Sequence, residues 1–239
     1  MLLPALSSAK QKAISIRCSS NLKQIGLAYF MYVQENNQMI GYVYSTGNEL
    51  NLWMNTIDDG YAGSSNIRIC PSASDTNGLA FGQPGTSSRP WSWPTSNPKW
   101  RFGSYAINGW LYYWSSTGPI ATIRSAADAP KFFQKDSGIT RPTDTPAFFD
   151  AIFPDTWPQI TDLLANDLTA GNSATSLGRC SISRHPLNGG KALAGQPVPG
   201  SINMAFADGH VSAWKLRDIK NVVWHVGFTP NPDPWAISP

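Results

Sequence analysis

Residues 6 to 35 read LSSAKQKAISIRCSSNLKQIGLAYFMYVQE, and this stretch carries the strongest periodic signal in the chain. Apolar side chains recur in it at intervals of three and four residues, which is the spacing of one face of an α-helix. The stripe consists of Ile14, Cys18, Leu22, Ile25, Tyr29 and Tyr32. Pro4 suits the start of a helix and Asn36-Asn37 suits a left-handed stop, so we predict one amphipathic helix of about 30 residues.

After this helix the sequence changes to short apolar runs separated by Gly, Pro, Asn and Ser. The runs that we predict to be strands are 39–44, 67–70, 105–111, 147–153, 202–207 and 211–216. A short helical turn is expected at 50–58, and the stretches 72–99 and 186–199 are predicted to be long surface excursions. A long helix followed by a meander of strands predicts an α+β domain, with the helix lying across an antiparallel sheet.

The clearest local signal among these strands lies near the C-terminus. The segments 203–207 and 210–214 flank Asp208-Gly209, a pair that suits a two-residue type I′ turn. Gly209 adopts a positive φ at little cost and Asp208 tolerates one. We therefore predict a tight hairpin here, with Phe206 facing the core.

The composition narrows the function classes. The 239 residues include 10 Trp, 20 Gly and 19 Pro but only 14% charged residues, which favours one loop-rich, aromatic domain. The formal charge of +3 is scattered along the chain, so nucleic acid is not expected as a partner. No HExxH, GxSxG or P-loop pattern is present to indicate an enzyme.

The three cysteines, Cys18, Cys70 and Cys180, are far apart and form no CxxC motif. This spacing argues against a zinc ribbon and against a thioredoxin-like redox motif. Two alternatives remain from the residues themselves. An exported chain would have one disulfide and one free thiol, whereas a chain in a reducing compartment would have three core thiols.

The N-terminus looks truncated. No stretch reaches the roughly 18 to 20 apolar residues that span a bilayer, and none has the layout of a complete signal peptide. The opening residues 1–6 nevertheless contain three large apolar side chains before a proline, which give a globular domain no obvious start. We interpret them as the end of a longer helix.

Several segments resemble the pilin-like proteins, which include type II secretion pseudopilins and type IV pilins. Residues 2–10 look like the last turn of the pilin membrane helix running into its soluble half. Residues 18–28 are similar to the family stretch Cys-x-x-Asn-Leu-Lys-Gln-Ile-Gly-Leu-Ala, which Cys70-Pro71 follows at a fitting distance. Arg184-His185 and residues 206–211 are similar to the family ending, in which His is followed after nine residues by Asp-Gly; residues 104–109 add a further match.

One departure from this pattern concerns the ending. Positions 186 to 207 place 22 residues between His185 and Asp208, where the family motif has nine. We interpret the surplus as a loop inserted around 189–199. If the insertion displaces His185, its expected contact with the hairpin at Asp208, Gly209 and His210 is lost.

The resemblance implies a structural subunit and not an enzyme. Residues 1–35 would be the soluble part of a spine helix whose membrane half is absent, and residues 36–239 a pilin-like head. Such subunits are trimmed by a prepilin peptidase, are anchored in the inner membrane with the head outside, and pack helix to helix in a fibre. The expected partners are other pilin-like subunits and the secretion or pilus machinery. This chain, without the membrane half, would be soluble and unable to polymerise that way.

Two details of structure follow from the same resemblance. Cys18 and Cys70 are expected to form a disulfide between the helix and the residue after a strand, which leaves Cys180 as the odd thiol. The first turns of the helix are expected to project from the domain toward neighbouring subunits. Leu2, Leu3 and Leu6 would then be exposed.

Other functions remain as alternatives. An exported module can bind glycans or protein cargo through exposed indoles, and the candidates here are Trp91, Trp93, Trp100, Trp110 and Trp114. A transition-metal or catalytic site would need His185, Asp150, Asp208 and His210 to converge; the simpler expectation is that His185 bonds backbone or Asp208 and holds the last hairpin.

No cofactor is expected. Calcium is an alternative, because related pseudopilins hold this ion in a loop of oxygen ligands. The candidates are Asp144, Asp150 and Asp155, with Asp162 and Asp167 in the same segment. Their spacing matches no EF-hand, and solvated loop carboxylates are the simpler interpretation.

Overall fold

The computed structural model describes residues 3–42, 52–58, 65–93, 102–185 and 190–231. Its longest element is the helix α1, which spans Leu3–Asn36 and contains 34 residues. Asn37, with a φ of 51°, ends the helix in the left-handed region that asparagine tolerates. The predicted helix is confirmed, and it begins three residues earlier than the predicted 6–35.

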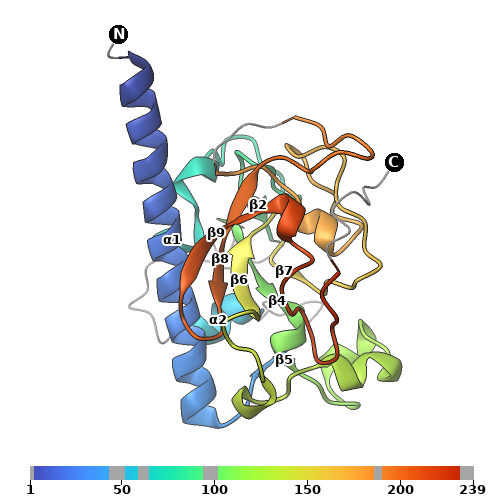
Figure 1. The fold of residues 1–239 in the computed structure, drawn as a ribbon. Coiled ribbons are helices and arrows are strands. Elements are labelled where there is room, and N and C mark those ends of the chain that lie inside the picture. Colours follow the sequence, from blue (N-terminus) through green and yellow to red (C-terminus); the bar gives the residue numbers. More distant parts are fainter. Residues whose placement is uncertain (1–2, 43–51, 59–64, 94–101, 186–189, 232–239) are drawn as a thin grey trace.

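The apolar stripe of α1 is buried only in its later part, as predicted. Cys18, Leu22, Ile25 and Tyr29 are buried in the core, whereas every described side chain from residue 6 to residue 13 is exposed. Leu6 has 69% of its surface exposed; the predictions for the side chains of Leu2 and Leu3 lie outside the described residues. Figure 1 shows the reason: the N-terminal turns of α1 extend beyond the sheet.

The main sheet has five strands in the order β7-β4-β6-β8-β9. Their bounds are β4 Tyr105–Asn108, β6 Pro146–Asp150, β7 Asp155–Thr156, β8 Ser201–Phe206 and β9 Val211–Lys215. All neighbouring pairs are antiparallel except β4 and β7, which pair in parallel at one edge. The α+β class is therefore confirmed, although the sheet is mixed and not purely antiparallel.

The remaining elements are short. β1 (Ile40–Gly41) pairs in parallel with β5 (Tyr112–Tyr113), β2 (Trp91–Ser92) pairs with β3 (Phe102–Gly103), and α2 spans Trp53–Asp58. The strand predicted at 67–70 is wrong, because η1 (Ser65–Arg68) is a 3₁₀ helix and Cys70 precedes another, η2 (Pro71–Ala73).

The central strands are covered on both faces. Phe148 of β6 packs against Tyr29 of α1, with ring centroids 5.5 Å apart, and its neighbour Phe149 packs against Trp224 at 5.1 Å. Side chains of consecutive strand residues point to opposite faces, so α1 covers one face and loops cover the other. In Figure 1, α1 runs along one side of the sheet and the irregular segments lie on the other.

The two segments predicted to be surface excursions contribute residues to the core. Trp91 and Trp93 of the first segment are buried, as is Val198 of the second. A single helix covers only one face of a sheet, so irregular segments supply the apolar cover for the other. The prediction that these segments lie wholly on the surface is wrong.

Gly26 of α1 is buried where the helix faces β8. A Cβ built on Gly26 would lie 3.6 Å from the Cβ of Ala205 in β8, an ordinary van der Waals contact. Because glycine inside a helix costs about 1 kcal/mol relative to alanine, we expect Gly26→Ala to raise the free energy of unfolding by about 0.5 to 1 kcal/mol. Urea unfolding checks this. A loss of stability would show that the helix cannot accommodate the methyl group.

Candidate functional site

A buried ion pair lies where β6 ends. The guanidinium of Arg184 and the carboxyl of Asp150 are 3.2 Å apart, and both side chains are fully buried. Arg184 also donates hydrogen bonds to the carbonyl oxygens of Thr86, Ser87, Ser104 and Ala151. One side chain thus joins the 86–87 loop, the start of β4 and the end of β6.

Three groups contact the carboxylate of Asp150: the guanidinium of Arg184, the backbone N–H of Asn203 and the imidazole of His185. Its Oδ2 accepts from the backbone N–H of Asn203 at 2.8 Å and lies 3.3 Å from Nε2 of His185. Burial by itself would raise the pKa of Asp150, but the charge and hydrogen bond of His185, the charge of Arg184 and the Asn203 donor together lower it. The carboxyl group is therefore held in its ionised form inside the core.

His185 connects this ion pair to the disulfide. Cys18 of α1 and Cys70 form the disulfide, with Cα atoms 5.1 Å apart, which agrees with the pairing expected from the resemblance. Nε2 of His185 lies 3.5 Å from Sγ of Cys70. Cys180 is the remaining cysteine; it is buried and free.

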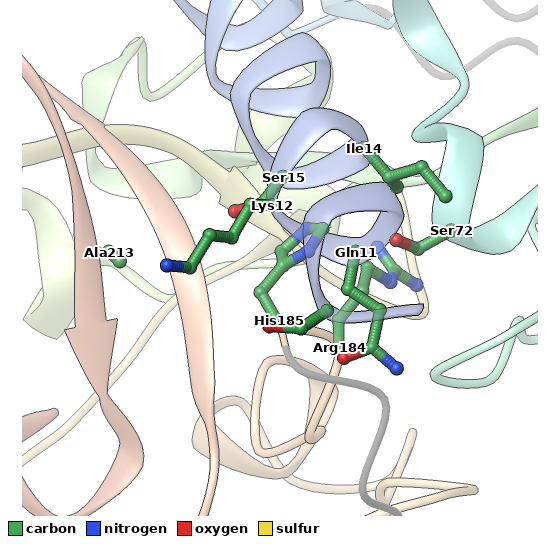
Figure 2. Close-up of a pocket in the computed structure, with 9 residues that line it drawn as sticks. Gln11, Lys12, Ile14, Ser15, Ser72, Arg184, His185 and Ala213 are labelled. Carbon is green, nitrogen blue, oxygen red and sulfur yellow. The ribbon is translucent and has the colours of Figure 1, made fainter. Parts of the chain in front are cut away.

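A pocket of about 360 Å³ lies next to the side chains of Arg184 and His185. It is lined by Ser8, Gln11, Lys12, Ile14, Ser15, Ser72, Arg184, His185 and Ala213. Figure 2 shows the α1 side chains next to His185 and Arg184, with Ser72 and Ala213 on the two sides. The pocket is thus framed by the exposed half of the helix, by η2 and by β9.

The predicted hairpin is present, but its turn differs from the prediction. The N–H of Gly209 donates to the carbonyl of Phe206, and the N–H of Phe206 donates to the carbonyl of His210, both at 2.9 Å. Only Gly209 in the turn has a positive φ, of 86°. The loop therefore has three residues with a glycine bulge, and the two-residue type I′ turn is wrong. Phe206 is buried, as predicted.

Asp208 and His210 stabilise this turn together. Oδ1 of Asp208 accepts from the backbone N–H of His210 at 3.0 Å and lies 2.6 Å from its Nδ1. The imidazole stacks on Phe206, with ring centroids 4.4 Å apart. These contacts of Asp208 and His210 brace the turn.

Asp208→Ala removes both of these interactions from an exposed turn. We expect a loss of about 1 kcal/mol, because a typical hydrogen bond contributes about 0.5 to 1.5 kcal/mol and solvent exposure keeps this carboxylate pair near that range, and a fall in Tm of about 2 to 4 °C for a chain of this size. Asp208→Asn keeps the Oδ1 acceptor and is the matched control, expected to retain most of the stability. Equal losses in the two variants would contradict this account.

The expected contact between His185 and the hairpin is not formed. The backbone N–H of His185 donates to Ser201 at the start of β8, whereas Asp208 follows Phe206 at the other end. Five residue steps along a strand correspond to about 16 Å. The four candidates for a shared metal or catalytic site therefore form two separate pairs, His185 with Asp150 and Asp208 with His210.

The tryptophans do not form the predicted binding surface. Trp91, Trp93 and Trp110 are buried, and Trp114 is half-buried against Phe132; Trp100 lies outside the described residues. Nε1 of Trp91 donates to the carbonyl of Tyr105 and Nε1 of Trp110 to that of Pro158, so these indoles satisfy their polar group inside the core. Trp91, Trp93 and Trp110 belong to the hydrophobic core, and Trp114 packs against it.

The calcium candidates also lie apart. Asp144 pairs with Arg141, Asp150 with Arg184 and Asp155 with Arg179. Among the described residues these carboxylates do not join into a cluster of three or more metal-ligating groups. Each of the three carboxylates is compensated by a different arginine.

Asp155, on β7, is a buried carboxyl whose pKa shifts upward. Burial raises its pKa to about 6, although the charges of Arg179 and Arg124 act in the opposite direction. Its Oδ1 is 3.4 Å from Arg179, while its Oδ2 is buried without a hydrogen-bond partner in the described part of the chain. The ionised form is therefore poorly solvated.

This raised pKa makes a pH-dependent contribution to stability. Between about pH 4 and pH 6 the folded protein binds the Asp155 proton and the unfolded chain does not, so stability is lost as the pH rises. We expect the difference in unfolding free energy between wild type and Asp155→Asn to fall by about 2 kcal/mol from pH 4 to pH 7.

Urea unfolding at the two pH values measures this difference. Asp144→Asn is the matched control, because Asp144 is exposed and also pairs with an arginine. A wild-type advantage over Asp155→Asn that grows with pH would contradict the assignment.

Sequence reasoning missed the central role of Arg184 and the partnership of His185 with Asp150. The only signal was the pair Arg184-His185 itself, and the partners of the two side chains lie 33 or more residues away, where no local pattern links them. Comparison adds no further guide: no protein-family model matches the sequence, and no curated protein or solved structure shows significant similarity to it.

Proposed function

We propose that the chain is the head and the soluble helix segment of a structural, pilin-like subunit, not an enzyme, and that this subunit, with its membrane half, assembles into a type II secretion or type IV pilus-like fibre through its N-terminal helix. The observation that carries this proposal is the division of α1. Its later half is buried against the sheet, while its first turns extend beyond the domain with their side chains exposed. The turns of α1 beyond the core bury little surface within their own domain, so packing inside the domain does not account for them.

The exposed side of α1 also carries large apolar residues. Ile16, Leu27, Met31 and Leu6 have 70, 59, 53 and 69% of their surfaces exposed. At 100° per residue these four positions fall within about 80° of one another around the helix. Single exposed apolar residues are ordinary, but a stripe on one side of one helix favours packing against a partner helix.

The other elements of the proposal follow from the pilin-like arrangement. The partners are further copies or related subunits together with the assembly machinery, and the head lies outside the inner membrane. A disulfide suits such an oxidising compartment. Within the described residues no helix is both long enough and apolar enough to cross a bilayer.

Photo-crosslinking in the producing cells tests the proposal. A photoreactive amino acid at Ile16 or Leu27 is expected to give a ladder of adducts at multiples of the subunit mass, because these positions face neighbouring helices. The matched controls are Phe81 and Leu193, which are similarly exposed but lie in loops of the head. Ladders from the control positions with none from α1 would refute assembly through the helix.

A further inference from the structure

Three potential metal ligands meet at the joint between α1 and the rest of the domain. Sγ of Cys18, Sγ of Cys70 and Nε2 of His185 all lie within 4.8 Å of one another, and all three residues are buried. They come from α1, from the residue before η2 and from the segment before β8. The disulfide occupies both sulfurs in this structure, so the ligand set exists only in the reduced protein.

The spacing of these atoms suits zinc. With Zn–S of about 2.3 Å, Zn–N of about 2.0 to 2.1 Å and tetrahedral angles, a sulfur and a nitrogen ligand lie about 3.6 Å apart. The observed distance between Cys70 Sγ and His185 Nε2 is 3.5 Å. Two thiolates on the same ion lie about 3.8 Å apart, so the sulfurs need only separate after the bond between them is broken.

The surroundings favour a neutral complex with one open position. Two thiolates balance the charge of a divalent ion, so no net charge is buried. The Arg184–Asp150 pair next to the site remains compensated when His185 turns its Nε2 to the ion, because Asp150 keeps its contacts to Arg184 and Asn203. His185 also lines the pocket, which gives a water molecule access to the fourth position.

We propose that reduction of the Cys18–Cys70 disulfide converts this joint into a binding site for one zinc ion, held by Cys18, Cys70 and His185. A thiol or phosphine reductant supplies two electrons, the sulfur–sulfur bond breaks, and two protons complete the thiols. Zinc then displaces these two protons on binding. The disulfide and the metal are alternative ways of fastening α1 to the head, independent of whether the protein assembles into a fibre.

Cobalt(II), which reports thiolate ligation optically, provides the direct test. Anaerobic titration of the phosphine-reduced full chain is expected to give a thiolate-to-cobalt charge-transfer band and tetrahedral ligand-field bands that saturate at one ion per chain. Zinc should displace the cobalt and abolish the bands. The oxidised protein is expected to give none.

Variants separate this site from the third cysteine. Burial raises the pKa of the Cys180 thiol, which disfavours the thiolate, so reduced Cys180→Ser is expected to bind cobalt as wild type does. Cys70→Ser should abolish the charge-transfer band, and His185→Ala should weaken binding at least tenfold. A band that survives Cys70→Ser or disappears in Cys180→Ser would overturn the proposal.

The folding state of the reduced protein is measured in parallel by near-UV circular dichroism. If the metal-free reduced chain is folded, it must bind cobalt for the proposal to stand. If it is unfolded, zinc is expected to restore the native spectrum and a cooperative thermal transition, because metal binding contributes directly to folding. Failure of zinc to restore them would equally overturn the proposal.

Discussion

Replacing Arg184 with methionine is expected to lower the free energy of unfolding by about 3 to 5 kcal/mol, the range found when one partner of a buried ion pair is removed. The variant leaves Asp150 without its guanidinium and leaves the carbonyls of Thr86, Ser87, Ser104 and Ala151 without this donor. Each buried polar group that loses its partner costs about 1 to 3 kcal/mol. Urea unfolding is expected to show a midpoint at a lower urea concentration for Arg184→Met than for wild type. The yield of soluble protein should also be lower.

Arg141→Met is the matched control. Arg141 pairs with Asp144 at 2.6 Å, but both side chains are exposed, and such pairs contribute about 0 to 1 kcal/mol. Arg184→Lys tests the geometry, because a lysine ammonium cannot reproduce the planar set of donors that reaches five acceptors. Near-wild-type stability of Arg184→Lys would show that charge alone matters and that the hydrogen-bond network does not.

Removing the Cys18–Cys70 disulfide is the second change with a large expected effect. The two cysteines are separated by 52 positions, for which the chain-entropy estimate of disulfide stabilisation is about 4 kcal/mol. We therefore expect Cys18→Ala/Cys70→Ala to lower the unfolding free energy by about 2 to 5 kcal/mol. The measurement includes a metal chelator, so that no ion replaces the bond.

Two controls accompany the disulfide experiment. Cys180→Ala removes a buried cysteine that forms no cross-link, and its loss is expected to be well below that of the double variant. Thiol titration of the denatured wild type should find one reactive group before reduction and three after it. Three reactive thiols before reduction would show that the disulfide is absent from the protein as produced.

Arg184 and the Cys18–Cys70 disulfide belong to one network of contacts between α1 and the rest of the domain. The disulfide fastens α1 to the segment before η2, His185 lies against Cys70, and Asp150 and Arg184 continue the contacts to β6 and the 86–87 loop. Since residues that share a network do not contribute additively, combining Arg184→Met with the disulfide variant is expected to cost less than the sum of the two changes, provided that the combined variant still folds. Unfolding of both single variants and the combination measures this coupling.

The sequence by itself determined the elements whose signals are local. The helix follows from apolar side chains repeating every three to four residues over 6–35, because one turn of helix brings such residues to one face. The hairpin of β8 and β9 follows from the alternation of apolar and polar side chains and from the glycine in its turn, all within 15 residues of chain. The pairing of Cys18 with Cys70 came from the resemblance of the surrounding segments and not from spacing.

Only the tertiary structure decided which distant residues meet. Arg184 finds acceptors 33 to 98 residues away, and His185 contacts Cys70 across 115 positions, separations at which no periodic pattern survives. The predicted tryptophan surface failed for a related reason. An exposed loop and a loop that packs on the core have the same Gly- and Pro-rich composition, and only the tertiary packing determines that Trp91, Trp93 and Trp110 are buried.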